Sequence, residues 1–361
     1  MYVAGQMGLI VKKCSLITLD RSYIRKGEIN PKQMFVITDV TTAIQHFLAN
    51  VPEQLESACL VMRRTCPKID IGLQCYDPDP CPLIDDCWTR ITAVSNNVFS
   101  LYRLRFTKAM EWYRAGILAC KDIPADTKLS NNQRIQIQAE KTGKAHVDKP
   151  EIRKFLSQLK YPLYFLDFET CNPAIPRFDN SSPYAVLPFQ YSLHVVTDLK
   201  KAPAHYSWLW DGLKPDPRGR MLKELKARIG NKGTILAYNA PYEKRVLREA
   251  GEVFKKYRAW VKQLDTRFLD LLSPFRSFHY YHPFQRGSAS IKMVLPALTG
   301  KGYDGLEISG GNQASAEFMR VFINDNEADR REAVRKELEE YCGLDTGGMF
   351  DIVRKLGEMV G

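Results

Sequence analysis

The stretch Tyr-Pro-Leu-Tyr-Phe-Leu-Asp-Phe-Glu-Thr, residues 161 to 170, constrains the fold more than any other part of the chain. Its apolar residues have the length and composition of a buried β-strand. Asp167 and Glu169 stand two residues apart near its end, and alternate residues of a strand point to the same face. The sequence therefore predicts a sheet from which two carboxylates emerge side by side.

Two adjacent carboxylates repel each other unless a cation neutralises their charge. Hard divalent ions such as Mg²⁺ and Mn²⁺ prefer oxygen ligands of this kind. One interpretation of Asp167 and Glu169 is therefore a metal site that supports phosphoryl chemistry. The alternative is an exposed strand end at which both acids are simply solvated, because Asp-x-Glu is a common tripeptide.

A second acidic pattern lies late in the sequence, within a helical pattern from about Asp329 to Val360. Tyr341 and Asp345 stand four residues apart there, which places them on the same face of a helix. If that face is buried, Asp345 can supply a third metal ligand and the Tyr341 hydroxyl can orient a water molecule. This second pattern favours the metal interpretation of the first.

An Asp-x-Glu strand followed by a late Tyr-x-x-x-Asp helix resembles the DEDD superfamily of 3′–5′ exonucleases, in its tyrosine variant, on an RNase H-like fold. The resemblance requires one more acid between the two patterns, and Glu243 is the candidate. Asn239 follows a short strand from Gly233 to Tyr238, and Glu243 then opens a helix. The superfamily usually carries Asp at this place, so Glu243 departs from its pattern by one methylene.

Five short phrases also occur in a fixed order along the chain: Leu166-Asp-Phe-Glu-Thr170, Pro188-Phe-Gln-Tyr-Ser192, Asp216-Pro-Arg218, Tyr238-Asn-Ala-Pro-Tyr-Glu243 and Gly287-Ser-Ala-Ser-Ile-Lys-Met-Val-Leu-Pro296. Together they resemble a bacterial family known as domain of unknown function 2779. This resemblance implies an RNase H-like nuclease domain behind a RecB/Cas4-like segment with clustered cysteines. It implies no particular substrate.

The predicted fold class is α/β, with an RNase H-like mixed sheet flanked by helices in residues 151–361. Residues 1–95 are interpreted as a truncated RecB/Cas4-like α/β segment, and residues 96–150 as a helical connector. The expected strands are 163–168, 189–196, 204–210 and 234–238. The expected helices are 40–63, 101–119, 131–142, 221–229, 243–254, 265–272 and 329–360.

Three cysteines are grouped in a proline-rich segment, at Cys75, Cys81 and Cys87. An iron–sulfur cluster normally needs four thiolates, and zinc needs four ligands. By the RecB/Cas4 resemblance, the chain begins inside such a core and lacks its upstream cysteine and its catalytic acids. We expect a ligand set for a 4Fe–4S cluster or zinc that is incomplete here or completed by a substitute, with free thiols as the alternative. The candidates for a fourth ligand are Cys14, Cys59 and Cys66.

Composition agrees with a globular protein, because 45% of the residues are apolar and 26% are charged. The net charge of +11 favours polyanionic partners such as nucleic acid, although a generic solvated surface gives the same count. No apolar run approaches the roughly 18 residues of a membrane helix, and the first residues do not resemble a signal peptide. We expect a cytoplasmic protein with no membrane partner, in which nine cysteines serve as thiols or ligands.

The resemblance implies that two ions, Mg²⁺ or Mn²⁺, about 3.5–4 Å apart are held by four acids: Asp167, Glu169, Glu243 and Asp345. Tyr341 would position the attacking water. The expected activity is metal-dependent 3′–5′ exonuclease hydrolysis of DNA or RNA, at single strands or 3′ ends. The alternatives are an inactive nucleic-acid-binding module and a structural protein built around a cysteine cluster.

Two further residues are candidates for nucleic-acid contact. Asn239 either contacts substrate, orients Glu243 or serves as a turn residue. Lys292 follows Gly287-Ser-Ala-Ser and either meets a phosphate where a helix begins or is a solvated surface residue.

Other residues have structural interpretations. Asp270 is expected to pair with Arg267 on one helix, and His194 to be a hydrogen-bonded core residue. Most of a group of aromatic residues are expected in the core, with one or two stacking on bases: Phe165, Phe168, Tyr184, Phe189 and Tyr191.

Overall fold

The computed structural model describes residues 1–65, 69–324 and 327–361 and divides into two compact units. Unit 1 comprises Met1–Pro78 and Asn172–Ala185. Unit 2 comprises Asp79–Cys171 and Val186–Gly361. The domain boundaries expected near residues 95 and 150 both fall inside unit 2. The division into three domains stays a prediction.

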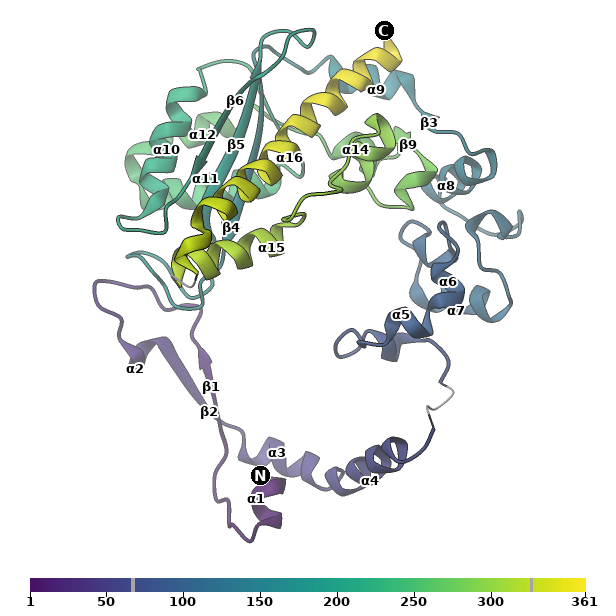
Figure 1. The fold of residues 1–361 in the computed structure, drawn as a ribbon, viewed down its shortest axis with the longest axis vertical. Helices are drawn as coiled ribbons and strands as arrows, with labels where there is room; N and C mark the ends of the chain where they lie inside the picture. The colour runs from purple at the N-terminus through teal and green to yellow at the C-terminus, as the bar shows by residue number, and fades with distance from the viewer. Residues whose placement is uncertain (66–68, 325–326) are drawn as a thin grey trace. The chain divides into compact units, whose positions relative to one another are not determined.

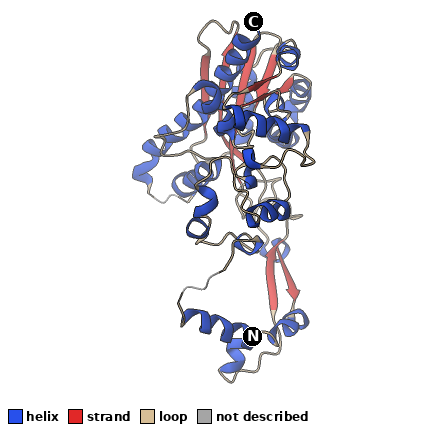
Figure 2. Ribbon diagram, turned by 90° about the vertical axis from the view of Figure 1, so that its right-hand side faces the viewer, coloured by secondary structure: helices blue, strands red, loops and turns tan. Residues whose placement is uncertain are grey.

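A five-stranded mixed sheet forms the centre of unit 2 (Figures 1 and 2). The strand order is β6-β5-β4-β7-β8, so β4 is the middle strand, antiparallel to β5 and parallel to β7. This arrangement confirms the predicted α/β class. The strands are β4 (Leu163–Cys171), β5 (Leu187–Val196), β6 (Ala204–Leu209), β7 (Thr234–Ala237) and β8 (Phe268–Asp270).

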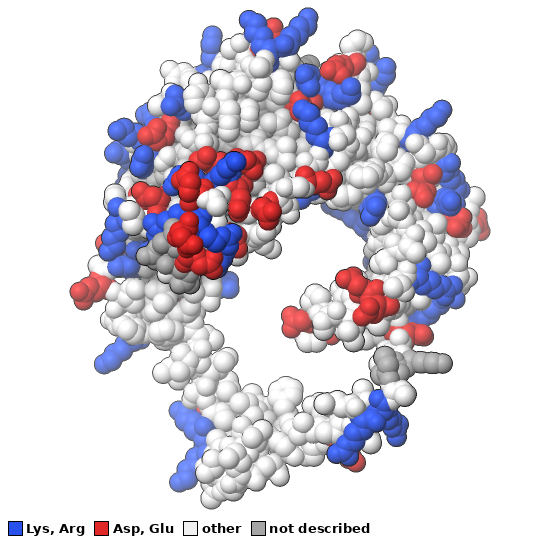
Figure 3. Space-filling view, viewed as in Figure 1, with Lys and Arg blue, Asp and Glu red and all other residues white. Residues whose placement is uncertain are grey.

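Helices cover both faces of this sheet (Figure 1). On one face lie α10 (Pro217–Arg228), α11 (Pro241–Val253) and α12 (Arg258–Asp265). On the other lie α14 (Ile291–Thr299), α15 (Gly311–Phe318) and the long α16 (Arg331–Val360). Charged residues of both signs gather over the N-terminal half of α16, in which Arg335 and Lys336 pair with glutamates one turn further on (Figure 3). Among the described residues, no helix has both the length and the apolar character that crossing a membrane requires.

The face of the sheet beneath α16 holds the largest part of the core. Phe165 of β4 is fully buried there and packs edge to face on Phe350 of α16, with ring centroids 6.0 Å apart. Glycines in α16 permit this close approach, because a Cβ on Gly348 would lie 2.7 Å from a methyl of Leu295 in α14. Since alternate residues of β4 share a face, Asp167 and Glu169 point to the same side as Phe165.

A series of short helices precedes the sheet in unit 2: α5 (Ile84–Cys87), α6 (Thr89–Thr92), α7 (Phe106–Arg114), α8 (Asn131–Thr142) and α9 (Lys149–Leu156). The sequence predicted α8 with its bounds, because Ser130 and Gln133 form a capping box and Gly143 adopts the left-handed conformation that ends the helix. The two-residue strand β3 (His146–Val147) pairs with β9 (Tyr280–Tyr281). One-turn α13 (Ser273–Arg276) lies between β8 and β9.

Three predicted helices were wrong in extent or kind. The helix expected over 101–119 is shorter, because Arg103 has a positive φ of 49° and Gly116 one of 83°. The helix expected over 40–63 is two helices, α3 (Thr41–Leu48) and α4 (Val51–Met62), with Pro52 in the first turn of the second. The segment expected as a helix over 265–272 contains β8, because pairing with β7 overrides the local apolar pattern.

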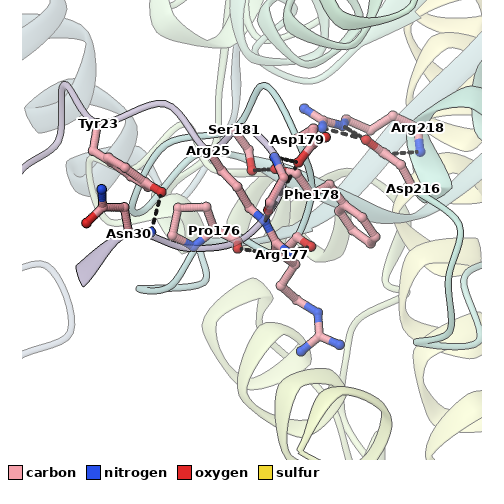
Figure 4. Close-up of polar contacts among 11 residues, drawn as sticks. Tyr23, Arg25, Asn30, Pro176, Arg177, Phe178, Asp179, Ser181, Asp216 and Arg218 are labelled. Carbon is pink, nitrogen blue, oxygen red and sulfur yellow. Dashed lines mark hydrogen bonds and ion pairs between the residues drawn. The ribbon is translucent and has the colours of Figure 1, made fainter. Parts of the chain in front are cut away.

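Unit 1 is organised around the two-stranded ribbon of β1 (Ser15–Leu19) and β2 (Phe35–Asp39), with α1 (Tyr2–Gln6) and α2 (Pro31–Met34). Arg25 ties these residues to the 172–185 loop that joins β4 to β5 (Figure 4). Its Nη1 donates to the carbonyls of Pro176 and Arg177 at 2.9 and 2.8 Å, and the Gly27 amide donates to Asp179. The loop that leaves the central strand of unit 2 is thus part of the packing of unit 1.

Gly233 tests how the middle of the sheet is assembled. Its φ is 97°, and a Cβ there would lie 2.1 Å from the carbonyl oxygen of Pro162, at the start of the parallel β4–β7 pair. We expect Gly233→Ala to lower the free energy of unfolding by about 2 kcal/mol or more, because both the backbone conformation and the contact are unfavourable. Urea denaturation measures the change. The control is Gly357→Ala in α16, where nothing lies within 4 Å and stability should stay equal or rise.

Candidate metal and catalytic site

The two acids of β4 lie together beneath α16, as their spacing predicts. Asp167 is half-buried and Glu169 is 7% exposed. With Cys342 of α16 they form a group whose ligand atoms all lie within 4.8 Å of one another. The Cys342 Sγ donates to Asp167 Oδ2 at 3.6 Å.

Asp345 reaches this group from the next turn of α16. It is 7% exposed, and its negative charge raises the pKa of both Asp167 and Glu169, which shows how near it lies. The Tyr303 hydroxyl donates to Asp345 Oδ1, and hydrogen bonding by Tyr341 also favours the ionised carboxylate. The structure therefore brings Tyr341 and Asp345 to the acids of β4.

Glu243 approaches from α11, which begins directly after β7. Glu243 is the third residue of the helix, where the helix dipole favours a negative charge. Its neighbour Tyr242 lies 2.5 Å from the Thr170 hydroxyl, which fixes the start of α11 against the end of β4. Glu243 is 3% exposed, and its Oε2 has no hydrogen-bond partner among the described residues. A buried carboxylate oxygen without a partner is unfavourable unless a cation approaches it.

Burial raises the pKa of all four acids, and repulsion by neighbouring acids adds to this effect at Asp167, Glu169 and Glu243. Burial is the largest cause, and it raises the pKa of Asp167, Glu169 and Glu243 well above the usual range of carboxylic acids. The pKa of Asp345 rises to about 6, because burial outweighs its hydrogen bonds with the two tyrosines. Burial likewise raises the pKa of Cys342, so its thiol is protonated at neutral pH.

Lys292 supplies a positive charge to this group. It lies in the first turn of α14, and its Nζ donates to the carbonyl of Ser309. The ammonium lies 5.3 Å from the centre of the Tyr341 ring and 5.5 Å from that of Tyr303. Its charge partly offsets the rise that burial causes in the pKa of Glu169 and Asp345. Lys292 thus lies beside the acids. The sequence had left open whether it contacts a phosphate or is a solvated surface residue.

Asn239 is an exposed turn residue, with a φ of 81°. The prediction of an ion pair between Asp270 and Arg267 was wrong. Arg267 donates to carbonyls of residues 230, 232 and 233, whereas Asp270 Oδ1 accepts the amides of Asn239, Ala240 and Leu272. Asp270 therefore fixes the turn that leads into α11.

His194 is half-buried, and its Nδ1 lies 2.8 Å from the Thr346 hydroxyl. Tyr184 is 45% exposed, lies in unit 1 and has the Arg21 guanidinium over its ring. The other aromatic residues of the predicted group are buried in unit 2, as expected: Phe165, Phe168, Phe189 and Tyr191.

The clustered cysteines remain a prediction. Cys75 belongs to unit 1, whereas Cys81 and Cys87 belong to unit 2. None of the three is in a disulfide, and neither are Cys14 and Cys59. Cys66, the remaining candidate for a fourth ligand, lies outside the described residues.

Two site residues were missed from the sequence. Cys342 follows Tyr341 and stands three residues before Asp345, so helical spacing alone places it near the buried face. Tyr303 lies in an irregular segment between α14 and α15, where no periodicity predicts the direction of a side chain.

Known proteins support the family resemblance. The family described as domain of unknown function (DUF2779) matches part of this chain. Residues 164–290 match that family. The match covers β4, β7 and the start of α11, which carry Asp167, Glu169 and Glu243, and it ends before Lys292 and α16.

Two curated relatives are also similar. An uncharacterised protein of Mycoplasma genitalium, MG366, is 24% identical over 56% of this chain and 33% of its own length. Its homologue in Mycoplasma pneumoniae is 23% identical over 54% of this chain and 32% of its own length. The chain thus spans about a third of the length of these relatives. No solved structure matches it.

The raised pKa values predict how stability depends on pH without metal. Between about pH 4 and pH 6 the folded chain binds more protons than the unfolded chain, since the pKa of Asp345 rises from 3.8 to about 6. In EDTA we expect the free energy of unfolding to fall by roughly 1–3 kcal/mol as pH rises through this window, and further above it for the other three acids.

Chemical denaturation at pH 5 and pH 7.5 measures this dependence. Asp345→Asn should reduce it and stabilise the metal-free protein at pH 7.5, because the buried charge is gone. Asp304→Asn, which removes an exposed acid, is the control. A metal-free protein that is more stable at pH 7.5 than at pH 5 would contradict the assignment.

Proposed function

We propose that the chain is a metal-dependent nuclease of the 3′–5′ exonuclease type, which hydrolyses phosphodiester bonds in DNA or RNA. One observation carries the proposal: four acids, three of them buried and Asp167 half-buried, converge from β4, α11 and α16, which are far apart in sequence. A cluster of this kind is unfavourable in the folded protein unless it serves a ligand of opposite charge.

The chemistry of the donor set fits hard divalent ions. The carboxylates offer oxygen ligands, which Mg²⁺ and Mn²⁺ prefer, and the protonated thiol of Cys342 is a poor competitor. Glu243 Oε2 is buried with no hydrogen-bond partner among the described residues, which leaves it available to a cation. Bound there, two such ions would activate a water molecule and stabilise the leaving oxygen.

The chain's own residues have distinct roles in this proposal. Asp167, Glu169, Glu243 and Asp345 hold the ions. Tyr341 orients the attacking water by hydrogen bonding, since its pKa is raised far above neutrality and its hydroxyl stays protonated. Lys292 faces the same space with a positive charge and is suited to contact the phosphate.

Charge supports a nucleic-acid substrate. The chain carries a net charge of +11, although its candidate site is built from acids. A surface with excess Lys and Arg attracts a polyanion over long range, whereas the site needs bound cations before it tolerates a phosphate. Iron–sulfur or zinc binding at Cys75, Cys81 and Cys87 would be a separate property, which metal analysis of the purified protein would detect.

The proposal predicts stepwise shortening from the 3′ end of 5′-labelled single-stranded DNA or RNA in Mn²⁺ or Mg²⁺. Asp167→Ala and Asp345→Ala should each lower the rate by about 100-fold or more, because each removes a ligand. Gel electrophoresis of timed samples measures the rate. Asp126→Ala, which removes an exposed acid in the segment before α8, is the control. Unchanged cleavage in both ligand variants would contradict the proposal.

Glu243 gives a second test that does not depend on turnover. We expect Glu243→Gln to weaken Mn²⁺ binding by about 10-fold, because a neutral amide replaces a buried ionised ligand. Glu243→Asp should retain binding, since Asp is the acid usual at this place in the superfamily that the sequence resembles. Isothermal titration with Mn²⁺ measures both. Equal affinity in the Gln variant and the unchanged protein would exclude Glu243 as a ligand.

A further inference from the structure

A hollow in unit 2 is lined by residues that neighbour the carboxylate site along the chain. It has a volume of about 490 Å³, and its lining includes the arginines Arg103 and Arg276 but no acidic residue. Asn239 and Ile291 also line it. Asn239 precedes Glu243 by four residues and Ile291 is followed by Lys292, so each wall continues into the candidate site.

The two arginines are available to a ligand. Both are exposed, and among the described residues neither guanidinium forms an ion pair. Arg103 lies over the Tyr102 ring, 5.3 Å from its centre. Asp270 is close enough for its charge to raise the pKa of Tyr238, but its Oδ1 already accepts three backbone amides. The hollow therefore has two arginines and no acid in its lining, and Asp270 behind the wall offsets only part of their charge.

Hydrogen bonds hold the walls of this hollow in place. The Tyr102 hydroxyl donates to the carbonyl of Arg276 at 3.3 Å, and its amide donates to Gln136 Oε1 at 2.8 Å. The Tyr238 hydroxyl likewise donates to the carbonyl of Ala289 at 2.7 Å, and both residues line the hollow. A Cβ on Gly287 would lie 2.1 Å from the Ser100 carbonyl, so the loop before α14 packs directly on the segment that carries Tyr102.

The backbone is also unusual at this hollow. Arg103 and Asn239 are non-glycine residues with positive φ, at 49° and 81°. Such conformations cost free energy, and they concentrate at binding and catalytic sites because they aim side chains that regular structure would turn away. Ser290 directly precedes α14, and its side chain makes no capping hydrogen bond, so its hydroxyl adds a donor beside the N-terminus of the helix.

We propose that this hollow, the Arg103 pocket, binds a backbone phosphate of the nucleic-acid strand whose end lies at the carboxylate site. This inference rests on the proposed nuclease function. It adds a path for the substrate strand, from the carboxylate site to the Arg103 pocket. Guanidinium groups bind phosphate through paired hydrogen bonds, and Asn239 and Ser290 supply neutral donors beside them. The phosphate bound here belongs to a nucleotide other than the one being released.

Fluorescence anisotropy with a labelled ten-nucleotide single-stranded DNA in Ca²⁺ tests the pocket. All proteins carry Asp167→Asn, so that hydrolysis does not interfere. The double variant Arg103→Gln/Arg276→Gln should bind about tenfold more weakly. The slope of log affinity against log salt should become shallower by about 0.7, as the loss of one phosphate contact to a single strand requires. Arg220→Gln, an exposed arginine on α10 outside the pocket, should bind like the parent.

Competition with a nucleoside monophosphate separates a strand phosphate from a released product. The affinity for the monophosphate should be the same in the double variant and the parent, because under the proposal the pocket holds the phosphate of a different nucleotide. Three results would each overturn the proposal. The double variant could bind the ten-nucleotide strand as tightly as the parent, or the parent could fail to bind that strand. The double variant could also lose as much affinity for the monophosphate as for the strand. Circular dichroism checks the folding of each variant.

Cleavage by the chain without Asp167→Asn is measured separately and reports on the proposed function alone. If that chain cleaves DNA or RNA but the double variant binds the strand normally, the pocket is refuted and the nuclease function stands.

Discussion

Repulsion among buried carboxylates is the constraint on which the rest of this structure depends. Asp167, Glu169, Glu243 and Asp345 approach one another from three elements, and burial raises the pKa of each. Removing such groups from water costs several kcal/mol per charge even after relaxation. The fold must therefore press together, by apolar packing, elements that their own charges drive apart.

That packing is supplied chiefly by α16. Its buried side chains, Phe350, Ile352, Val353 and Leu356 among them, lie in one cluster with Phe165 of β4 and Leu295 of α14. Gly343 and Gly347 face His205 and His194 of the sheet, so the helix lies close along the strands. Lys292 adds a positive charge from α14, and the Tyr303 hydroxyl a hydrogen bond from the segment that follows. The acids are thus held by an apolar frame and by partial compensation of charge.

The sequence revealed those parts of the site that follow a periodicity. The period of two in β4 places Asp167 and Glu169 on one face, and the four-residue spacing in a helix brings Tyr341 near Asp345. Glu243 has no such signal and was found only through the resemblance to a family. Tyr303 could not be found, because an irregular segment gives no rule for where its side chain points.

The same distinction explains the fold. The long α16 and the capped α8 were predictable because each has a sustained pattern or both of its end signals. The three-residue strand β8 was mistaken for helix, because its identity depends on hydrogen bonds to β7 and not on its own residues. At Arg103 the backbone adopts the left-handed conformation without a glycine. Arginine has no preference for this conformation, so the sequence did not predict the turn.

The position of α16 in the chain has a consequence for biosynthesis. Asp345 is separated from Asp167 by about half of the sequence, and the helix that carries it is the last described element. A ribosome therefore synthesises the segments that carry the first three acids well before the segment that carries the fourth. Until α16 emerges, the central sheet lacks the cover over one face and the cluster lacks a member, so a partly synthesised chain cannot assemble the site. The proposed site is therefore complete only after α16 has been translated.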